Sequence, residues 1–374
     1  MNAAPRPSPA QRSQFTAAYR LLDEAIAAHA FPGCAFGLFA NHQVQFIDAR
    51  GRFTYDEVSP AVTPATVYDI ASITKILSTT AAAMLLHQRG QLNLNTHLSD
   101  LLPGFIPNRA EGAVSPTAGV AVSPTVGGLL AHNSGLPAYV EFFRTAATPE
   151  ALLQACFALP LEVPPGTRAA YSDPGFILLG KALESITGEA LYPWVSREIF
   201  APLALAATRF SPPATDRPLI PPTENDTTFR HRVIQGEVQD ENAFVLGGAA
   251  GHAGLFSNVP DLLRFSAEIL AASANSPDAR LFNSSTIELF AQRQPPPGSS
   301  RALGWDTPSG ISSSGHLFSP HSIGHLGFSG CSLWIDLDAA LAIVLLTNRT
   351  WPDRRSQLIR QLRPAFHDAI RQAL

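Results

Sequence analysis

Apolar residues near the start of the chain recur first at helical spacing and then in two short runs. The helical pattern is set by Phe15, Tyr19, Leu22 and Ile26. Steps of three and four residues place side chains on one face of a helix, so this segment predicts an amphipathic helix. The apolar runs at 34–40 and 43–48 are separated by only two residues, and apolar and polar residues alternate in the second. They predict a β-hairpin.

The middle of the chain reads mainly as helix. Residues 72–88 are apolar, rich in alanine and free of glycine and proline, which predicts a regular buried helix. Further helices are predicted at 149–158, 175–187 and 258–273, the second ending at Gly188 and the last capped by Asn258. The proline-rich stretches 211–222 and 294–300 are interpreted as surface crossings, because proline disrupts helix interiors and central strands.

The last part of the chain returns to short β-rich runs, which predict antiparallel strands at 325–328, 332–336 and 341–347. A final helical stripe, interrupted by Pro364, is formed by Leu358, Leu362, Phe366 and Ile370. This order predicts an α/β (α+β) fold, with an antiparallel sheet flanked by helices from both termini and an inserted, mainly helical domain. The expected division is a sheet domain from 10–80 and 280–374, a helical domain at 81–279, and a disordered leader at 1–9.

The composition narrows the class of protein. Of the 374 residues, 45% are hydrophobic and 15% charged, and the net charge is −4. A chain of this kind folds around a large core and lacks the basic field that attracts nucleic acid or an anionic membrane. No apolar signal segment and no run of about 18 apolar residues appears, so a cytoplasmic protein without membrane contact is expected. The three cysteines, Cys34, Cys156 and Cys331, imply no disulfide framework and no metal pair.

The first candidate for chemistry is the segment Ser72-Ile73-Thr74-Lys75. Residues three apart lie on one face of a helix, so the lysine amine can reach the serine hydroxyl. A serine becomes a good nucleophile only when a neighbouring group takes its proton, and a desolvated lysine can do so if its pKa is lowered. Lysine is scarce, because Lys75 and Lys181 are the only two in the chain. Lys181 is interpreted as a surface helix residue.

Further motifs follow in a fixed order: Tyr171-Ser172-Asp173, then His325-Leu326-Gly327, with supporting segments at 129–137 and 246–256. Together with Ser72 and Lys75 they resemble the active-site motifs of the serine β-lactamase and penicillin-binding protein superfamily. The similarity is greatest to class C β-lactamases and their esterase-like relatives, and it runs from about residue 20 to 350. It implies a β-lactamase/transpeptidase-like fold.

The resemblance also implies roles for single residues. Ser72 would attack a carbonyl and form an acyl-enzyme, while Lys75 and Tyr171 share its proton. The backbone N–H groups of Ser72 and Phe328 would form the oxyanion hole. No cofactor or metal is expected, and the substrate would be a small-molecule ester, amide or β-lactam.

Two departures from the family pattern bear on the substrate. Asp173 stands where the family has asparagine, and a carboxylate cannot donate to a substrate carbonyl but can hold Lys75 as a cation. His325 and Leu326 replace the lysine and threonine of the strand motif, which weakens the binding of a substrate carboxylate. These changes favour esters, then D-amino-acid peptides or other amides, then β-lactams. A binding or sensor module that kept only the scaffold is the alternative.

Other polar residues are assigned with alternatives left open. His252 is grouped with Asp173, His325, Leu326 and Gly327 as a substrate contact, although it and His132 are as easily structural histidines. Glu224 and the run 240–242 are interpreted as loop braces rather than as a carboxylate pair or a metal site. No zinc motif and no G-x-S-x-G motif is present.

Overall fold

The computed structural model describes residues 5–109 and 122–374, so positions 1–4 of the expected leader lie outside the described residues. The main sheet has five antiparallel strands in the order β10-β11-β12-β1-β2. Their bounds are β1 Gly33–Ala40, β2 Gln43–Gly51, β10 Ser322–Leu326, β11 Ser332–Asp336 and β12 Leu341–Thr347. Both ends of the chain contribute to the sheet, and β1 pairs with β12 from Cys34 opposite Thr347 onward. The predicted hairpin and the sheet built from both termini are confirmed.

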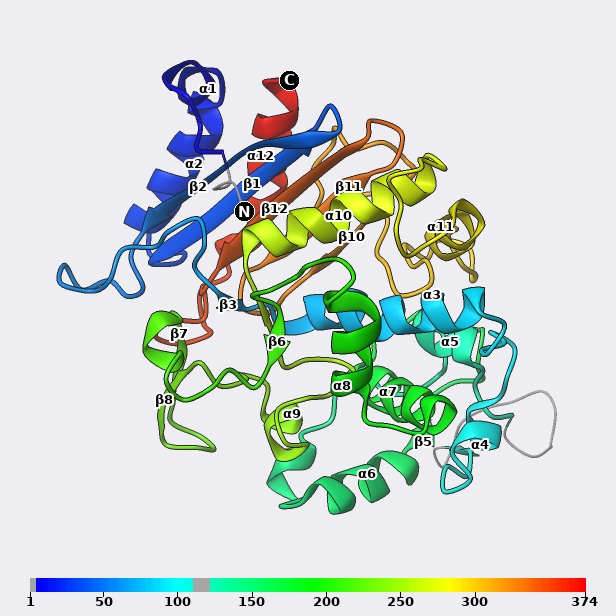
Figure 1. Ribbon diagram of the computed structural model, residues 1–374. Helices are drawn as coiled ribbons and strands as arrows, with labels where there is room; N and C mark the ends of the chain where they lie inside the picture. Colours follow the sequence, from blue (N-terminus) through cyan, green and yellow to red (C-terminus); the bar gives the residue numbers. More distant parts are fainter. Residues whose placement is uncertain (1–4, 110–121) are drawn as a thin grey trace.

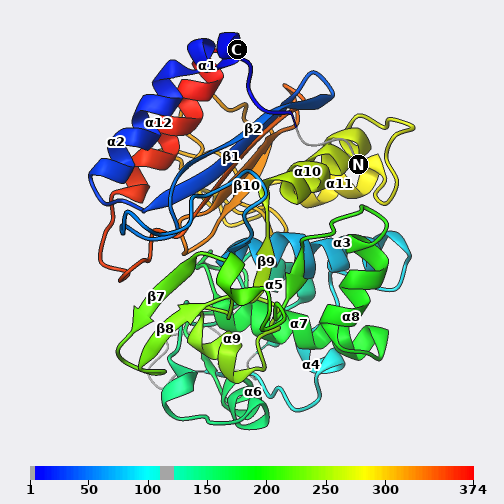
Figure 2. The same ribbon diagram turned by 60° about the vertical axis from the view of Figure 1, so that its left-hand side comes forward.

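Helices cover both faces of this sheet (Figures 1 and 2). One face carries α1 (Pro9–Gln14), α2 (Thr16–Ala27) and α12 (Ile359–Gln372). The other carries α10 (Val259–Ser273), against which α11 (Ser284–Ala291) packs. Strands β1 and β12 are buried along their whole length because both of their faces are covered. The division of the chain into domains remains a prediction, and α10, which falls within 81–279, packs against the sheet.

The rest of the described chain forms a mainly helical region beside the sheet (Figure 1). Its α-helices are α3 Ala81–Gln88, α4 Leu98–Leu101, α5 Val126–Leu130, α6 Pro149–Phe157, α7 Asp173–Thr187, α8 Leu191–Val195 and α9 Glu241–Val245. Its short strands are β3 Tyr68–Asp69, β4 Asn108–Arg109, β5 Pro160–Leu161, β6 Arg209–Phe210, β7 Pro222–Asp226, β8 Arg232–Gln235 and β9 Leu255–Ser257. Short 3₁₀ turns lie at Ala71–Ile73, Phe142–Arg144 and Arg217–Leu219, and a π turn at Ser196–Phe200.

The predicted regular helix at 72–88 has three different windings. It begins as the 3₁₀ turn Ala71–Ile73, widens to a π-helix over Lys75–Thr80, and becomes α3 from Ala81. The π turn lies where a side chain bonds outside the helix, since Thr79 Oγ1 donates to the carbonyl of Gly251 at 2.6 Å. Wide turns of this kind occur often at functional sites.

Two other elements differ from their predicted bounds. Strand β10 covers residues 322–326 rather than 325–328, because the chain turns at Gly327. Pro364 lies inside α12 without ending it. It cannot donate a hydrogen bond to the carbonyl of Arg360, and the helix absorbs the loss of that single bond because its apolar stripe is buried against the sheet.

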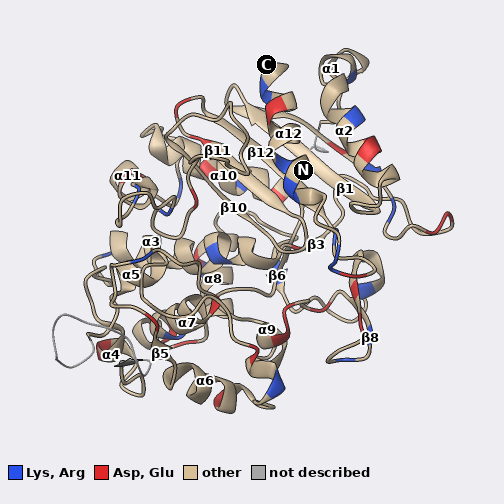
Figure 3. Cartoon of the chain, turned by 180° about the vertical axis from the view of Figure 1, so that it is seen from behind, with Lys and Arg blue, Asp and Glu red and all other residues tan. Residues whose placement is uncertain are grey.

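Charged residues of both signs are interspersed along the chain (Figure 3). All three cysteines are free and buried. In the described ranges, no helix has the length and apolar character needed to cross a membrane. Likewise, the described residues contain no group of three or more His, Cys, Asp or Glu side chains placed to hold a metal ion.

Candidate active site

Ser72 lies at a sharp bend between β3 and the helical segment that continues into α3. The preceding residue, Ala71, has a φ of +47°, a region that non-glycine residues rarely adopt. Asp69 braces this bend, because its carboxylate accepts from the N–H of Ala71 at 2.8 Å and from that of Gln239 at 2.8 Å. Burial raises the pKa of Asp69 to about 6, although these two N–H groups oppose the shift. The strained backbone therefore holds Ser72 in one place.

Lys75 is fully buried and surrounded by oxygen atoms. Its Nζ donates to Ser72 Oγ at 2.9 Å, to Asp173 Oδ1 at 2.7 Å and to the carbonyl oxygen of His252 at 3.0 Å. The three acceptors come from the helix start, from the first residue of α7 and from the loop before β9. All three ammonium protons are thus used, which is the condition under which a lysine cation is buried without a large penalty.

The charge on Lys75 follows from these contacts. Burial alone lowers the pKa of an ammonium, but here the Asp173 carboxylate, together with the oxygen of Tyr171, outweighs it and raises the pKa above its ordinary value. Lys75 is therefore an ammonium at neutral pH in the resting protein. In this state it orients Ser72 and stabilises negative charge on the serine oxygen. The contact between Lys75 and Asp173 that the sequence suggested is present.

Tyr171 lies beside Lys75, with the ammonium nitrogen 4.9 Å from the centre of its ring. Burial raises the pKa of Tyr171, and the Lys75 cation acts against that shift. The ring is held from behind by His132, whose ring centre is 4.5 Å away. His132 Nδ1 accepts from the N–H of Ser172 at 3.0 Å, and burial holds the pKa of His132 well below its usual range. His132 is thus a neutral support for the tyrosine and does not line the cavity.

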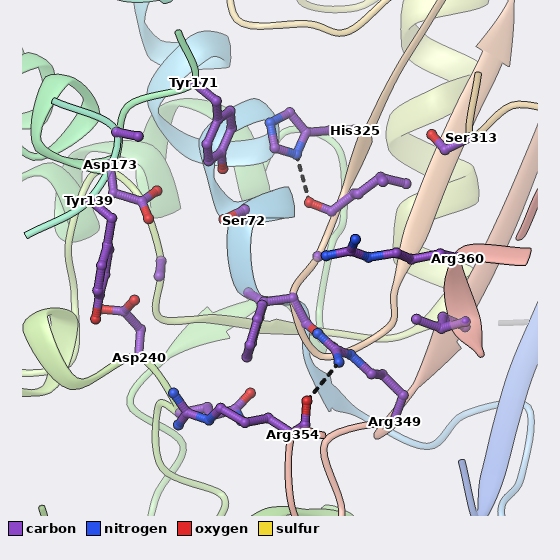
Figure 4. A pocket seen from close by; sticks show the side chains of 18 of the residues that line it. Ser72, Tyr139, Tyr171, Asp173, Asp240, Ser313, His325, Arg349, Arg354 and Arg360 are labelled. Atoms are coloured by element: carbon purple, nitrogen blue, oxygen red, sulfur yellow. Dashed lines mark hydrogen bonds between the residues drawn. The ribbon is translucent and has the colours of Figure 1, made fainter. Parts of the chain in front are cut away.

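His325 projects from β10 toward Tyr171, with the two ring centres 5.9 Å apart (Figure 4). Its Nδ1 lies 2.8 Å from the carbonyl oxygen of Leu326, which can only accept, so Nδ1 carries the proton. Burial, together with the Lys75 and Arg301 cations, holds the pKa of His325 well below its usual range. The ring is neutral, and its Nε2 is a bare acceptor without a partner in the described residues. The residue that replaces the family's strand lysine carries no positive charge.

The turn after β10 comes very close to the bend at Ser72. A Cβ added to Gly327 would lie 2.5 Å from the carbonyl oxygen of Ile70, so only glycine allows this approach. The next residue, Phe328, has an N–H group without a hydrogen-bond acceptor among the described residues. A free amide near the serine is what an oxyanion hole requires. The geometry thus agrees with the roles expected for Gly327 and Phe328, which remain predictions.

These side chains meet at one wall of a cavity of about 1050 Å³. Ser72, Tyr171, Asp173, His325, Leu326, Gly327 and Phe328 all line it. Figure 4 shows Arg360 reaching into the same space from α12. The sequence reasoning missed Arg301, Arg349, Arg360 and Arg363, which also line the cavity.

His252 differs from its expected role as a substrate contact. Its ring is 1% exposed and does not line the cavity, because Nε2 pairs with Asp240 Oδ1 at 2.9 Å. Only its main-chain carbonyl reaches the site, through Lys75. The acidic residues act as braces, as expected: Asp240 also caps α9, while Glu224 and Glu241 bind Arg354.

Replacing Asp173 by asparagine should move the acid limb of the kcat/KM profile to lower pH. The substitution removes a charge that raises the pKa of both Lys75 and Tyr171, whereas the burial that lowers the pKa of the ammonium remains. A base acts only when deprotonated, so activity then appears at lower pH whichever of the two accepts the proton. The measurement is a pH–rate profile of the wild type and of Asp173→Asn.

Selective ¹³C-lysine labelling tells which group titrates. The chain has two lysines, so two ε-carbon signals are expected, and Lys181, which pairs with Glu184 on α7, is the internal reference. The Lys75 signal should titrate at lower pH in Asp173→Asn than in the wild type. An unchanged or higher midpoint would contradict the electrostatic account of this site.

Sequence comparisons place these motifs among known proteins. A family model described as Beta-lactamase matches residues 19–365. A putative D-alanyl-D-alanine carboxypeptidase of Escherichia coli K12 is 32% identical over 312 residues, which cover 77% of this chain and 70% of that protein. An N-acetylmuramyl-L-alanine amidase of Bacillus subtilis 168 is 31% identical over 315 residues, covering 76% and 68%.

Solved structures share the fold at lower sequence identity. EstCE1, a hydrolase with promiscuous acyltransferase activity, superposes with a TM-score of 0.75 at 22% identity, covering 97% of this chain and all of that one. Simvastatin synthase (LovD) from Aspergillus terreus gives 0.73 at 19% identity, covering 96% and 98%. The octameric penicillin-binding protein homologue from Pyrococcus abyssi gives 0.69 at 21%, covering 88% and 72%.

Proposed function

The chain belongs to the Beta-lactamase family, a family of serine hydrolases, and we propose that it hydrolyses an ester or amide through an acyl-enzyme on Ser72. The observation that carries this proposal is the 2.9 Å contact between the buried Lys75 ammonium and Ser72 Oγ at the wall of a large cavity. A scaffold kept only for binding has no need of a fully buried lysine cation. The cost of burying such a charge is large unless it is paired.

The reaction follows from the positions of the groups. The Lys75 ammonium stabilises the phenolate form of Tyr171, and this phenolate is the base. Ser72 Oγ adds to the substrate carbonyl while its proton passes to the phenolate oxygen, which leaves Tyr171 as the neutral phenol. The carbonyl oxygen gains negative charge and is bound by the N–H groups of Ser72 and Phe328. Tyr171 then returns the proton to the leaving oxygen or nitrogen, and the bond to the leaving group breaks. Water releases the acyl group by the same steps.

The proposed substrate is, more narrowly, an amide or ester whose leaving group resembles an amino acid. Two relatives above 30% identity are named for amide cleavage, as a carboxypeptidase and an amidase. Good β-lactams are less suited, because neutral His325 and apolar Leu326 stand where the family has a lysine and a threonine. The substrate's anionic group would instead meet Arg360 on the α12 wall of the cavity.

Covalent trapping tests the proposed function. Wild-type protein is mixed with a fluorophosphonate probe and, separately, with a p-nitrophenyl ester, a D-alanyl-D-alanine peptide and a chromogenic cephalosporin. Mass spectrometry should place the phosphonyl adduct on the peptide that contains Ser72, with turnover of ester or peptide exceeding that of the cephalosporin. Labelling at another serine, or none, would refute the assignment of the nucleophile.

Arg360→Gln should raise KM about tenfold for a substrate with a free carboxylate and leave its amidated analogue unchanged. Among the described residues Arg360 has no ion-pair partner, so a substrate anion does not have to displace one. The matched control is Arg144→Gln, because Arg144 also lines the cavity but is engaged by Glu141 at 2.6 Å. Equal effects on the charged and amidated substrates would exclude an anion subsite at Arg360.

A further inference from the structure

Two buried arginines hold the turn that follows β10. Arg349 and Arg363 are each 6% exposed, and both donate to main-chain carbonyls of this turn. Neither forms an ion pair with a carboxylate in the described parts of the chain. Burying a guanidinium without a counter-charge is costly, so an arrangement of two such groups beside one turn calls for an explanation.

Arg363 is bonded to the peptide unit that carries the proposed oxyanion donor. Its Nη2 donates to the carbonyl oxygen of Gly327 at 2.7 Å. That carbonyl and the N–H of Phe328 belong to one and the same amide group. The guanidinium also donates to Cys331 O at 2.9 Å and to Gly330 O at 3.1 Å, which fixes the rest of the turn.

A cation that donates to a carbonyl oxygen draws electron density out of the amide. The N–H at the other end of the group becomes more acidic and a stronger hydrogen-bond donor, since hydrogen bonds in a chain strengthen one another. We propose that Arg363 is a positioning residue that polarises the Gly327–Phe328 amide, so that the Phe328 N–H binds the oxyanion more tightly than the ground-state carbonyl. This inference rests on the proposed function, in which that N–H is an oxyanion donor.

The charge needed for this effect is present at working pH. Burial lowers the pKa of Arg363 to about 10, which still leaves the guanidinium protonated near neutrality. The field of a buried cation is little screened by solvent. Its direction also fits, because a positive charge behind the amide favours negative charge in front of it.

Arg349 supplies a control at the neighbouring amide. Its Nε donates to the carbonyl oxygen of Phe328 at 2.8 Å, and that amide group carries the N–H of Ser329 rather than that of Phe328. Arg349 also donates to the carbonyls of Arg354 and Ser356. It matches Arg363 in residue type, burial and contact with the turn, but it acts one peptide further along.

The test compares affinity for an oxyanion mimic with affinity for substrate. A phenylboronic acid adds to the active serine and places a negatively charged oxygen in the oxyanion hole. For Arg363→Met, boronate affinity and kcat/KM of a p-nitrophenyl ester should fall together by about 10- to 100-fold, while KM changes less than about threefold. Arg363→Lys, which keeps the charge, should be intermediate. Arg349→Met also removes a contact with this turn but leaves Arg363 bonded to the Gly327–Phe328 amide, so it should lose clearly less boronate affinity than Arg363→Met.

The outcomes distinguish a failure of the polarising role of Arg363 from a failure of the proposed function. If Arg363→Met keeps wild-type boronate affinity, or if both arginine variants lose it equally, the polarising role is wrong although the proposed function stands. If wild-type protein binds no boronate at all, the oxyanion hole itself is misassigned. Circular dichroism and thermal unfolding monitor folding. If Arg363→Met does not fold, boronate affinity is compared between Arg363→Lys and Arg349→Lys, and an equal loss in both contradicts the polarising role.

Discussion

Ser72→Ala should lower kcat for ester or amide hydrolysis by about 10⁴- to 10⁶-fold, the largest effect of any single substitution in this chain. The variant loses the atom that forms the acyl-enzyme, and what remains is binding and electrostatic stabilisation of a direct attack by water. Substrate binding should persist, because the other residues that line the cavity are unchanged. The measurement is steady-state turnover of a p-nitrophenyl ester together with equilibrium binding of a non-reactive substrate analogue.

Ser78→Ala is the matched control for this substitution. Ser78 lies on the same helix and is fully buried, but its hydroxyl does not line the cavity and has no hydrogen-bond partner among the described residues. Removing it should leave turnover within about twofold. Residual turnover in Ser72→Ala that stays within about tenfold of wild type would move the nucleophile to another residue.

Much of the fold follows from short-range patterns in the sequence. The cap at Asn258, the glycine that ends α7 at Gly188 and the short spacing of the first hairpin each act within a few residues, so the sequence alone predicts them. The order of helical and β-rich segments along the chain then predicted which segments build the sheet. The contact of Lys75 with Asp173 was also within reach, because a buried lysine needs a partner and the motif offers a carboxylate.

The remaining features depend on neighbours far away in sequence. The π-winding after Lys75 is associated with a bond to Gly251, and the tautomer of His325 is set by a carbonyl that is positioned by the turn of the strand. His252 looked like a pocket residue because it stands among glycines, yet Asp240 draws its ring into the interior. The buried position of Arg363 could not be predicted, because a helical arginine ordinarily points to solvent. Only the packed turn after β10 provides acceptors for its guanidinium.

Lys75→Met should reduce kcat/KM by about 10³- to 10⁴-fold while keeping the protein folded. Methionine has a similar shape and buries well, but it removes the ammonium that orients Ser72, pairs with Asp173 and stabilises the phenolate form of Tyr171 during the reaction. Asp173 is then left as a carboxylate without its partner, so some loss of thermal stability is expected as well. Lys181→Met, at the only other lysine, is the control and should leave turnover unchanged.

The double variant Ser72→Ala/Lys75→Met separates a shared role from independent ones. If the lysine acts only through the serine, then once Ser72 is gone its removal costs nothing further, and the double variant should be as inactive as Ser72→Ala alone. Additive losses would mean that Lys75 stabilises the transition state by a route that does not involve the serine oxygen. Such a result would leave the 2.9 Å contact between Nζ and Oγ as an arrangement of the resting protein only.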